Sequence, residues 1–325
     1  MTNPFIEQPD FFDEKVRCMW FTGRGGIFHT HGEDAGIEGV WSGHGQVRGI
    51  FHSPVQTSYK TGAFQEGSTL KAVKWLHRDL MMGFHVTDTP DRAMEDNESD
   101  FLGIFEYEED EWDDNPEPTT LHIDTFKSGE RRLDLMMYEH PEVESDVDPI
   151  EQQYLNPILK LRAAQPHWYQ PDHWTRWPKQ DDPQYGATSA SGFIEVSNPT
   201  DRPMKIKWIL TRAQWNVPDF SWKGPKYSRR PGGVYKDRII PLQPITEVQG
   251  GAVISLDTAN DLMVRDHNYT NALPALLPNG QAFIHVVPPY TPKTLLPISY
   301  TGAPAGGAMA TLVQPRRWTA PWGRE

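Results

Sequence analysis

The sequence predicts a mainly β protein with two domains, and three observations support this prediction. Apolar residues alternate with polar ones in several short runs, which is typical of half-buried antiparallel strands. The 325 residues include 29 Pro and 26 Gly, which indicates many turns between short elements. Only the stretch 93–107 has a clear helical pattern. A chain of this length has room for two domains of roughly 100–200 residues each.

The first half of the chain is expected to hold short strands around one helix. Extended segments are predicted at 54–57, 71–86 (two strands), 121–125 and 131–137. The turn 127–130 joins two of them into a hairpin. The apolar residues of 157–164 fit a helix or a strand, and Pro157 favours a strand. The helix at 93–107 has an apolar face formed by Met94, Phe101, Leu102 and Phe105. Asp91 or Asn97 is the expected N-cap.

The second half begins with the most strongly patterned stretch, Thr188 to Arg212. Two alternating runs flank a turn signal at 198–203, NPTDRP, which predicts a β-hairpin. The same pattern returns at 251–258, 282–287 and 309–313. Short strands separated by Pro and Gly, with no helical stretch among them, predict a β-sandwich.

A Pro- and Trp-rich stretch, 165–185, is the expected linker between the two domains. Trp168, Trp174 and Trp177 lie within ten residues, beside His167 and His173. Flat indole rings can stack on sugars, so one interpretation is a carbohydrate platform. The favoured interpretation is that these rings pack the linker against both domains.

Charge is divided unevenly along the chain. The formal net charge is −13. Residues 1–185 carry 16 Lys and Arg against 35 Asp and Glu, whereas residues 186–325 carry 15 against 9. The acidic half is expected to repel the phosphates of a nucleic acid. The single Cys18 excludes an intramolecular disulfide. The first residues lack the pattern of a signal peptide and no apolar run is long enough to span a membrane, so we expect synthesis and folding in a cytosol without membrane insertion.

Two clusters of candidate metal ligands lack the spacing of a known site. Four histidines, His29, His31, His44 and His52, lie in the segment 29–52 near acidic residues. No third or fourth ligand has diagnostic spacing, so loop histidines are the default interpretation. The acidic insert 106–118 contains eight carboxylates but lacks the order and central Gly of a calcium-binding EF-hand loop. A solvated acidic loop is favoured there.

Catalytic motifs are not evident in the sequence. It contains no G-x-S-x-G, and Cys18 has no local histidine signature. A pair of acids for glycoside hydrolysis cannot be nominated, because the chain has many candidates. We therefore expect no catalytic residue, no cofactor and no metal.

One aromatic and basic segment, 214–238, is the best candidate for contacts with a glycan or a protein partner. Trp, Tyr and Arg dominate protein interfaces, and a basic surface can also meet a polyanion. The residues that we single out are Trp215, Trp222, Tyr227, Arg229 and Arg230.

A resemblance to a known family runs through most of the chain. In the second half it is carried by 192–203 (GFIEVSNPTDRP), 250–258 (GGAVISLDT), 287–289 (VPP) and 316–323 (RRWTAPWG). In the first half it is carried by Asp100-Phe101, Thr125 with 129–133 (GERRL), and 164–168 (AQPHW). These segments resemble minor tail proteins of long-tailed (siphovirus) actinobacterial phages, of the distal tail protein type.

The resemblance implies a fold for each half. Residues 1–180 would form a tail-tube-like β-sandwich or barrel with one flanking helix, and would build a ring. Residues 186–325 would form a galectin-like β-sandwich outside that ring. The family has no catalytic residues to transfer, and it assigns no role to the acidic insert or to the histidine-rich loop.

The resemblance also implies a function. Six copies would close a hexameric ring at the tail tip of the virion, which assembles in the host cytoplasm. The ring would join the tail tube protein to the tail-tip hub and other minor tail proteins. DNA would pass through its acidic lumen without specific binding.

Two alternatives to this structural role stay open. One is a carbohydrate- or receptor-binding protein that acts through the C-terminal sandwich, and the other is a glycan hydrolase.

Overall fold

A computed structural model describes residues 17–114, 116–143 and 148–325. The chain divides into two compact units. Unit 1 contains the described residues up to Tyr169 together with Trp318–Arg324, and unit 2 contains Gln170–Arg317 and Glu325. The C-terminal segment thus returns to the unit in which the chain begins, which no pattern in the sequence indicated. The proposed domain limits, 1–180 and 186–325, stay predictions.

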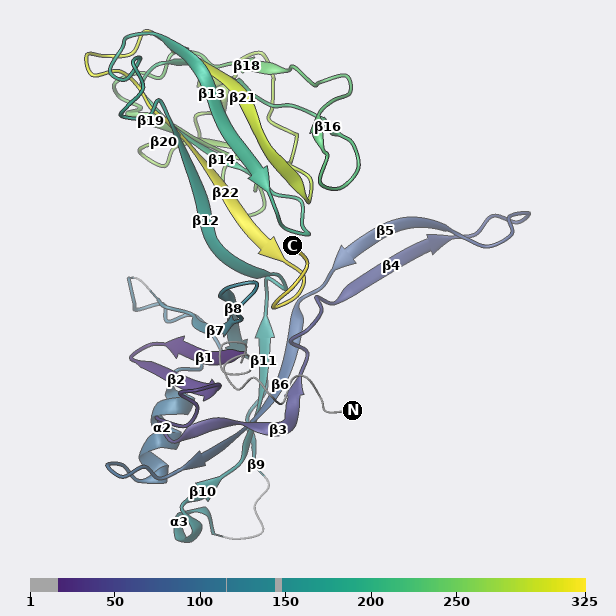
Figure 1. Ribbon diagram of the computed structural model, residues 1–325, viewed down its shortest axis with the longest axis vertical. Coiled ribbons are helices and arrows are strands. Elements are labelled where there is room, and N and C mark those ends of the chain that lie inside the picture. Colours follow the sequence, from purple (N-terminus) through teal and green to yellow (C-terminus); the bar gives the residue numbers. More distant parts are fainter. Residues whose placement is uncertain (1–16, 115, 144–147) are drawn as a thin grey trace, which may run out of the picture. The chain divides into compact units, whose positions relative to one another are not determined.

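Unit 1 is built from short antiparallel strands, which confirms the mainly β prediction for this half (Figure 1). Its strands are β1 (Cys18–Gly23), β2 (Gly26–His31), β3 (Val40–Arg48), β4 (Val55–Lys60), β5 (Thr69–Trp75), β6 (Arg78–Thr87), β7 (Thr119–Asp124), β8 (Arg131–Met137), β9 (Glu142–Val143), β10 (Tyr154–Leu155) and β11 (Pro157–Ala163). Its helices are α2 (Met94–Gly103) and α3 (Pro149–Gln152).

Two runs of neighbouring strands meet at β8. One has the order β2-β1-β7-β8 and the other the order β3-β6-β11-β8, with every pair antiparallel. Alternate residues of these strands point into one apolar core, in which Phe21, Phe84 and Phe101 are fully buried. The predicted hairpin of β7 and β8 is confirmed by their pairing.

Helix α2 confirms the predicted helix but not its cap. Met94 and Phe101 of the predicted apolar face are buried. The helix ends at Gly103, four residues before the predicted end, so Phe105 lies beyond it. The residue before the helix is Ala93, which supplies no side-chain cap. Asn97 instead lies in the second turn, where its amide donates to the carbonyl oxygen of Thr87 at 2.8 Å. The prediction that Asp91 or Asn97 caps this helix was therefore wrong.

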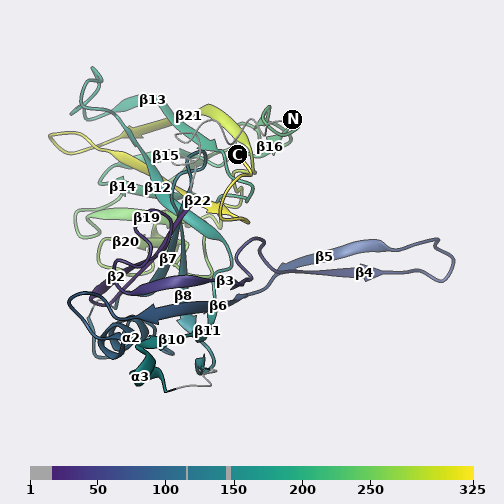
Figure 2. The same cartoon turned by 60° about the horizontal axis from the view of Figure 1, so that its bottom comes forward.

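Strands β4 and β5 form a two-stranded hairpin that extends away from the rest of unit 1 (Figures 1 and 2). These strands pair only with each other. Nearly every residue of the pair is exposed. We call residues 55–75 the arm.

Unit 2 contains two antiparallel sheets with a shared core. The first sheet has the order β13-β21-β15-β18 and the second β12-β22-β14-β19-β20. Their bounds are β12 (Trp168–Trp177), β13 (Ala190–Asn198), β14 (Lys207–Thr211), β15 (Gln214–Pro218), β18 (Ile239–Pro241), β19 (Gly251–Ser255), β20 (Val264–Asp266), β21 (Thr291–Thr301) and β22 (Ala310–Trp318). A small pair, β16 (Trp222–Lys223) and β17 (Arg230–Pro231), and helix α4 (Leu273–Leu276) complete the unit. Trp208, Trp215 and Tyr300 are fully buried in its core.

The predicted hairpin at 188–212 is wrong, although both of its strands exist. Strand β13 pairs with β21, whereas β14 pairs with β19 and β22 in the other sheet. Asn198 is fully buried, and its amide donates to the carbonyl oxygens of Arg202, Val287 and Pro288 at 2.8–3.1 Å. These bonds hold the connection open, so that the chain passes from one sheet to the other instead of folding back.

The expected strand at 282–287 is also absent from the described structure, apart from a bridge between Met204 and Val287. The backbone N–H groups of Ile284 and His285 donate to the carboxylate of Asp219. A side chain thus satisfies the donors that a neighbouring strand was expected to satisfy.

The stretch 165–185 is more ordered than a linker, because ten of its residues form β12. Strand β12 pairs with β22, and near its start Tyr169 pairs with Arg132 of β8. Trp168 is buried in the core of unit 1 and Trp177 in the core of unit 2, while Trp174 is about half exposed. The three indoles therefore do not form one platform, and the packing interpretation fits two of them.

Candidate functional site

The five residues singled out in 214–238 do not form one surface, because Trp215 belongs to the core. Its side chain is fully buried, its ring lies 4.9 Å from that of Tyr300, and its N–H donates to the carbonyl oxygen of Thr211 at 2.8 Å. This burial leaves no indole face for a ligand. Strict alternation in β15, in which Trp215 and Val217 are buried, is the signal that marked it as a core residue.

The other four residues lie together on one long loop that includes β16 and β17. Trp222 packs half-buried against the core, whereas Tyr227 is 62% exposed and its ring lies 5.1 Å from that of Tyr290. Arg229 donates to the carbonyl oxygen of Pro289, and Arg230 is exposed. The loop therefore presents an aromatic ring and positive charge to solvent.

Asp219 fixes the base of this loop. Its side chain is almost fully buried and accepts hydrogen bonds from Arg238 at 2.5 Å and from the ring of His285 at 3.0 Å. It also accepts from the backbone of 284–285. A buried carboxylate is stable only when several donors surround it, and this loop provides them. Nothing in the sequence marked this residue.

The arm has apolar side chains that unit 1 does not cover. Val55, Tyr59, Leu70 and Val73 are 48–58% exposed, and Phe64 near the tip is fully exposed. A two-stranded hairpin is marginally stable alone in water. Contiguous exposed apolar residues mark a surface that contacts a partner.

The base of the arm is firmly held, in contrast to the arm itself. Arg78 is completely buried and donates to the carbonyl oxygens of Ile50 at 2.7 Å and Pro166 at 3.0 Å. Further donations reach Gly49, Thr319 and the hydroxyl of Ser53. Burial lowers the pKa of Arg78 to about 10, which still leaves it charged at neutral pH.

The C-terminal segment is part of the same framework of unit 1. The guanidinium of Arg131 lies 3.9 Å from the ring centre of Trp318, and it donates to the carbonyl oxygens of Ala320 and Gly323 at 2.8 and 2.9 Å. Arg131 and Trp318 are both buried. The RRWTAPWG motif thus provides packing and hydrogen bonds within unit 1.

A buried histidine lies on the β1-β7-β8 sheet. His122 is 7% exposed, shares a hydrogen bond of 2.8 Å with the hydroxyl of Thr22, and lies 2.7 Å from a carboxylate oxygen of Glu130. The ring of Trp20 stacks on it at 5.0 Å. Burial lowers the pKa of His122, and the contact with Glu130 opposes this shift without overcoming it.

In each of the two clusters of candidate metal ligands, one residue makes a local contact. His29 lies 2.8 Å from Glu38, and in the acidic insert Asp110 accepts from Arg24 at 2.6 Å. Arg24 and the backbone N–H of Trp112 lower the pKa of Asp110. Within residues 17–114, 116–143 and 148–325, no group of three or more His, Cys, Asp or Glu is placed to hold a metal ion.

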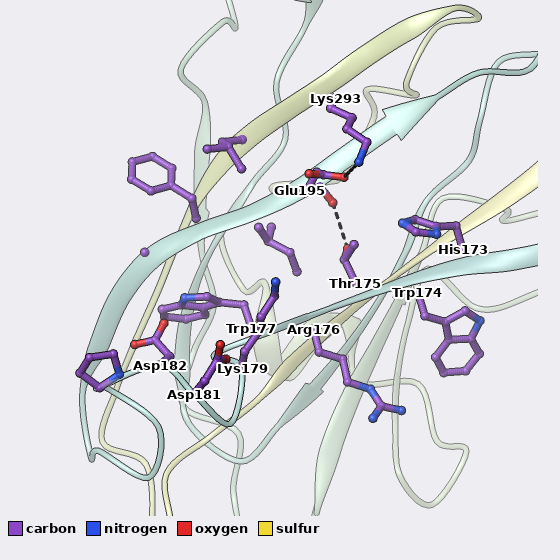
Figure 3. Close-up of a pocket in the computed structure, with 15 residues that line it drawn as sticks. His173, Trp174, Thr175, Arg176, Trp177, Lys179, Asp181, Asp182, Glu195 and Lys293 are labelled. Atoms are coloured by element: carbon purple, nitrogen blue, oxygen red, sulfur yellow. Dashed lines mark hydrogen bonds and ion pairs between the residues drawn. The ribbon is translucent and has the colours of Figure 1, made fainter.

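A groove in unit 2 lies between the edge strands β12 and β13 (Figure 3). Its volume is about 1110 Å³. Trp177 and Ile194 are among its apolar lining residues, and Lys179, Asp181 and Asp182 gather at one end. At the other end His173 lies near Glu195, and burial lowers the pKa of this histidine. Trp177 and His173 are close in the sequence, but no local pattern indicated the strand that lies opposite them.

Comparison with known proteins supports the family resemblance. Minor tail protein Gp27 of Mycobacterium phage D29 is 24% identical over 311 residues, which cover 86% of this chain and 91% of the relative. Minor tail protein Gp27 of Mycobacterium phage L5 is 25% identical over 236 residues, which cover 63% and 70%. No protein-family model matches the chain. The resemblance to phage minor tail proteins is confirmed by these relatives.

A solved structure confirms the fold. The Dit (gp 19.1) protein of SPP1, described as a paradigm of the hub adsorption apparatus in phages that infect Gram-positive bacteria, has a TM-score of 0.54 and 12% identity. The alignment covers 92% of this chain and 98% of that protein. The mainly β, Dit-like architecture is therefore shown, whereas the galectin-like character of unit 2 stays a prediction. No helix within the described residues is long and apolar enough to cross a bilayer.

Proposed function

We propose that this protein is a structural component of a phage tail tip, and that six copies form a ring. The ring joins the tail tube protein on one side to the tail-tip hub and other minor tail proteins on the other. Its place is in the virion, after assembly in the host cytoplasm. Sequence similarity to two minor tail proteins and the Dit-like fold support the tail assignment.

The single observation that carries self-assembly is the arm. Five large apolar side chains, Val55, Tyr59, Phe64, Leu70 and Val73, are half or fully exposed on a hairpin that pairs with no other described strand. Covering them would remove apolar surface from water, which stabilises an interface by about 25 cal/mol per Å². In a closed ring each arm would contact the next copy, so that the apolar side chains of every arm are covered.

Free strand edges on unit 1 offer a second type of contact. Strand β2 pairs only with β1, and β3 pairs only with β6, so each has one edge without a partner strand among the described residues. Edges of this kind favour pairing with another chain. A head-to-tail contact between copies uses different surfaces on each, and such contacts close into rings at a fixed rotation.

The acidic residues of the first half would keep DNA from binding to the wall of the ring. Residues 1–185 carry 35 carboxylates against 16 Lys and Arg. A lumen lined by that half repels the phosphates of passing DNA, because the counterion release that drives DNA binding requires basic groups. DNA would therefore pass without adhering. We assign the protein no catalytic role.

Glycan or receptor binding through unit 2 is the second candidate function. The observation that favours it is the loop bearing Trp222, Tyr227 and Arg230, in which an exposed ring lies beside positive charge. A glycan array tests it directly: binding that is lost on Tyr227→Ala would support it, and a flat array would leave the structural role alone.

The experiment that tests the ring is the mass of the full chain in solution across a concentration series, followed by electron microscopy of the largest species. We expect six-membered rings with a central hole. In a variant without the arm, residues 55–75 are replaced by Gly-Ser-Gly. This junction is short enough, because the N–H of Leu76 already donates to the carbonyl oxygen of Pro54 at 3.1 Å. The variant is expected to stay monomeric.

A matched control removes exposed apolar groups from unit 2. Val234 and Val248 are 86% and 84% exposed, and their replacement by Ser is expected to leave the ring intact. Rings that form equally well without the arm, or a full chain that stays monomeric up to its solubility limit, would contradict the proposal.

A further inference from the structure

The outward edge of β13 is the starting observation. Phe193 lies opposite Pro297 of β21. Because proline has no N–H, this pair cannot exchange hydrogen bonds, so the N–H and C=O of Phe193 point away from β21. Ser191 and Glu195, two residues away on either side, point their backbone groups in the same direction.

Side chains cover this edge on both sides of Phe193. The amide of Gln184 both donates to the carbonyl oxygen of Ser191 and accepts from its N–H, at 3.0 and 2.9 Å. Thr175 and Gln314 donate to the carbonyl oxygen of Glu195 at 2.9 and 3.2 Å (Figure 3). In the described structure, the N–H and C=O of Phe193 have no such partner. One donor and one acceptor therefore face the groove between two closed positions.

The indole of Trp177 lies beside Gly192, the residue before Phe193. Trp177 is 4% exposed and lines the groove, and its indole N–H has no hydrogen-bond acceptor among the described residues. A methyl group on Gly192 would lie 2.5 Å from this nitrogen. The backbone of Gly192 is not left-handed, so the absence of a side chain matters here for space. Only glycine leaves room beside the indole N–H.

The open position suits an acetamido group with a sugar hydroxyl beside it. The acetamido carbonyl oxygen accepts from the N–H of Phe193, and the hydroxyl donates to the carbonyl oxygen of Phe193. A peptide strand that added to β13 would need the positions at Ser191 and Glu195 as well, and both are closed. A small acyl-amide group requires only the open position.

The side chains around the open position at Phe193 suit a sugar. The ring of Phe193 is 60% exposed and Trp174 is 52% exposed, and flat apolar sugar faces stack on such rings. Lys179, Asp181 and Asp182 at the near end supply the donors and acceptors that sugar hydroxyls use. The groove of about 1110 Å³ is large enough for a short oligosaccharide.

We propose that the groove between β12 and β13 binds an N-acetylated hexosamine of a glycan, with its acetamido group seated on the backbone of Phe193. This site shares no residue with the arm or with the loop at 222–230, and it does not depend on the ring. The protein would thereby recognise a surface glycan in addition to its structural role.

Calorimetric titration of the full chain with a trimer of N-acetylglucosamine tests the site, and the matched probe is the uncharged glucose trimer cellotriose, which has a hydroxyl in place of each acetamido group. We expect the acetylated trimer to bind at least about tenfold more tightly, because a missing partner leaves a desolvated backbone group unsatisfied. Equal affinity for the two trimers, or no binding of either, would overturn the proposal.

Two variants locate the amide. Phe193→Ala removes the ring and keeps the backbone N–H, whereas Phe193→Pro removes both at an edge where proline is tolerated. We expect Phe193→Pro to bind about tenfold more weakly than Phe193→Ala. If the proline variant does not fold, the pair of trimers still decides the question on the native chain. N-acetyl-alanine methylamide is the third probe: if it binds as tightly as the sugar, the site recognises peptide amides and the glycan assignment is wrong.

Discussion

The arm and the β13-β21 pair are both antiparallel ladders with alternating apolar residues, yet only one of them buries a face. In β13 and β21 alternate residues such as Ile194, Leu296 and Ile298 are almost fully buried in the sandwich core. In the arm, Tyr59 faces Leu70 across the strands, and both are about half exposed. Alternation thus predicts that a face will be covered, but it does not say whether the chain itself or a partner covers it.

The two ladders also differ in whether their free edges are covered. The free edge of β13 is covered by Gln184, Thr175 and Gln314 at all but one position, which prevents another strand from adding there. Strands β4 and β5 pair with no further strand among the described residues. Natural proteins cover edges that must not pair. The uncovered edges of the arm therefore favour pairing with a strand of another chain.

The largest expected effect comes from the base of the arm. Arg78→Leu leaves the carbonyl oxygens of Gly49, Ile50, Pro166 and Thr319 without this donor, and a buried acceptor that loses its donor costs about 1–3 kcal/mol. We expect the free energy of unfolding to fall by about 4 kcal/mol in total, since some of these oxygens will regain water. Hydrogen exchange in β6, measured alongside thermal unfolding, locates the loss in unit 1.

The control for this variant is Arg162→Leu. Arg162 forms an exposed ion pair with Asp79 at 2.7 Å. Exposed pairs of this kind contribute less than about 1 kcal/mol. An equal loss of stability in both variants would show that burial of Arg78 is not what holds the base.

The second prediction makes the same substitution in both ladders. Leu296 is 2% exposed in β21, and Leu70 is 49% exposed in β5. We expect Leu296→Ala to lower the free energy of unfolding by about 2–5 kcal/mol, because a buried leucine leaves a cavity. Leu70→Ala is expected to cost less than about 0.5 kcal/mol in the monomer, as exposed substitutions do.

The two variants should rank in the opposite order when assembly is measured instead of stability. In sedimentation at matched protein concentration, Leu70→Ala is expected to shift the species toward monomer, while folded Leu296→Ala still assembles. A stability loss from Leu70→Ala as large as that from Leu296→Ala would mean that the arm is already packed in the monomer.

Much of the local structure could be predicted from the sequence, because it depends on neighbouring residues. The strand at 131–137 and the helix near 94–103 follow from apolar periodicity, and Pro157 favoured a strand over a helix at 157–163. The strand with which each of them pairs could not be predicted from this periodicity. Asn198 looked like a turn residue, and only its bonds to Val287 and Pro288, about ninety positions away, show that it holds a crossing between sheets.

The candidate sites were harder to predict than the fold for the same reason. Alternation could have identified Trp215 as a core residue, since its neighbours in β15 alternate. The burial of Arg78 and the return of Trp318 to unit 1 depend on contacts between distant segments, and no local pattern reports them. The groove beside Phe193 arises from two strand edges that pair with different partners.

The third prediction tests the covered edge of β13. Gln184→Ala removes the side chain that bonds both backbone groups of Ser191. These bonds are exposed, so we expect a loss of about 1 kcal/mol in the free energy of unfolding. Hydrogen exchange at the N–H of Ser191 should accelerate, while that of Ile194, which faces β21, should not. Unchanged exchange at Ser191 would show that another group covers this edge.

The smallest expected effect is a pH dependence within unit 1. Burial lowers the pKa of His122 below its unfolded value of about 6.5. Below that pH the unfolded chain binds a proton that the folded chain resists, so this histidine makes unit 1 less stable as the pH falls from about 6.5 through the folded pKa. Above pH 6.5 both states are neutral and its contribution is constant.

Substitution of this histidine separates its contribution from general acid unfolding. His122→Gln keeps polar atoms near Thr22 and Glu130 but cannot take up a proton. The slope of stability against pH below about 6.5 is therefore expected to be shallower in His122→Gln than in the native chain, whereas His44→Gln, at an exposed position, should leave the slope unchanged. An identical slope in all three proteins would mean that the acid sensitivity of unit 1 arises elsewhere. A slope that changes only in His122→Gln would show that the β1-β7-β8 sheet, unlike the arm, depends on a group buried by its own chain.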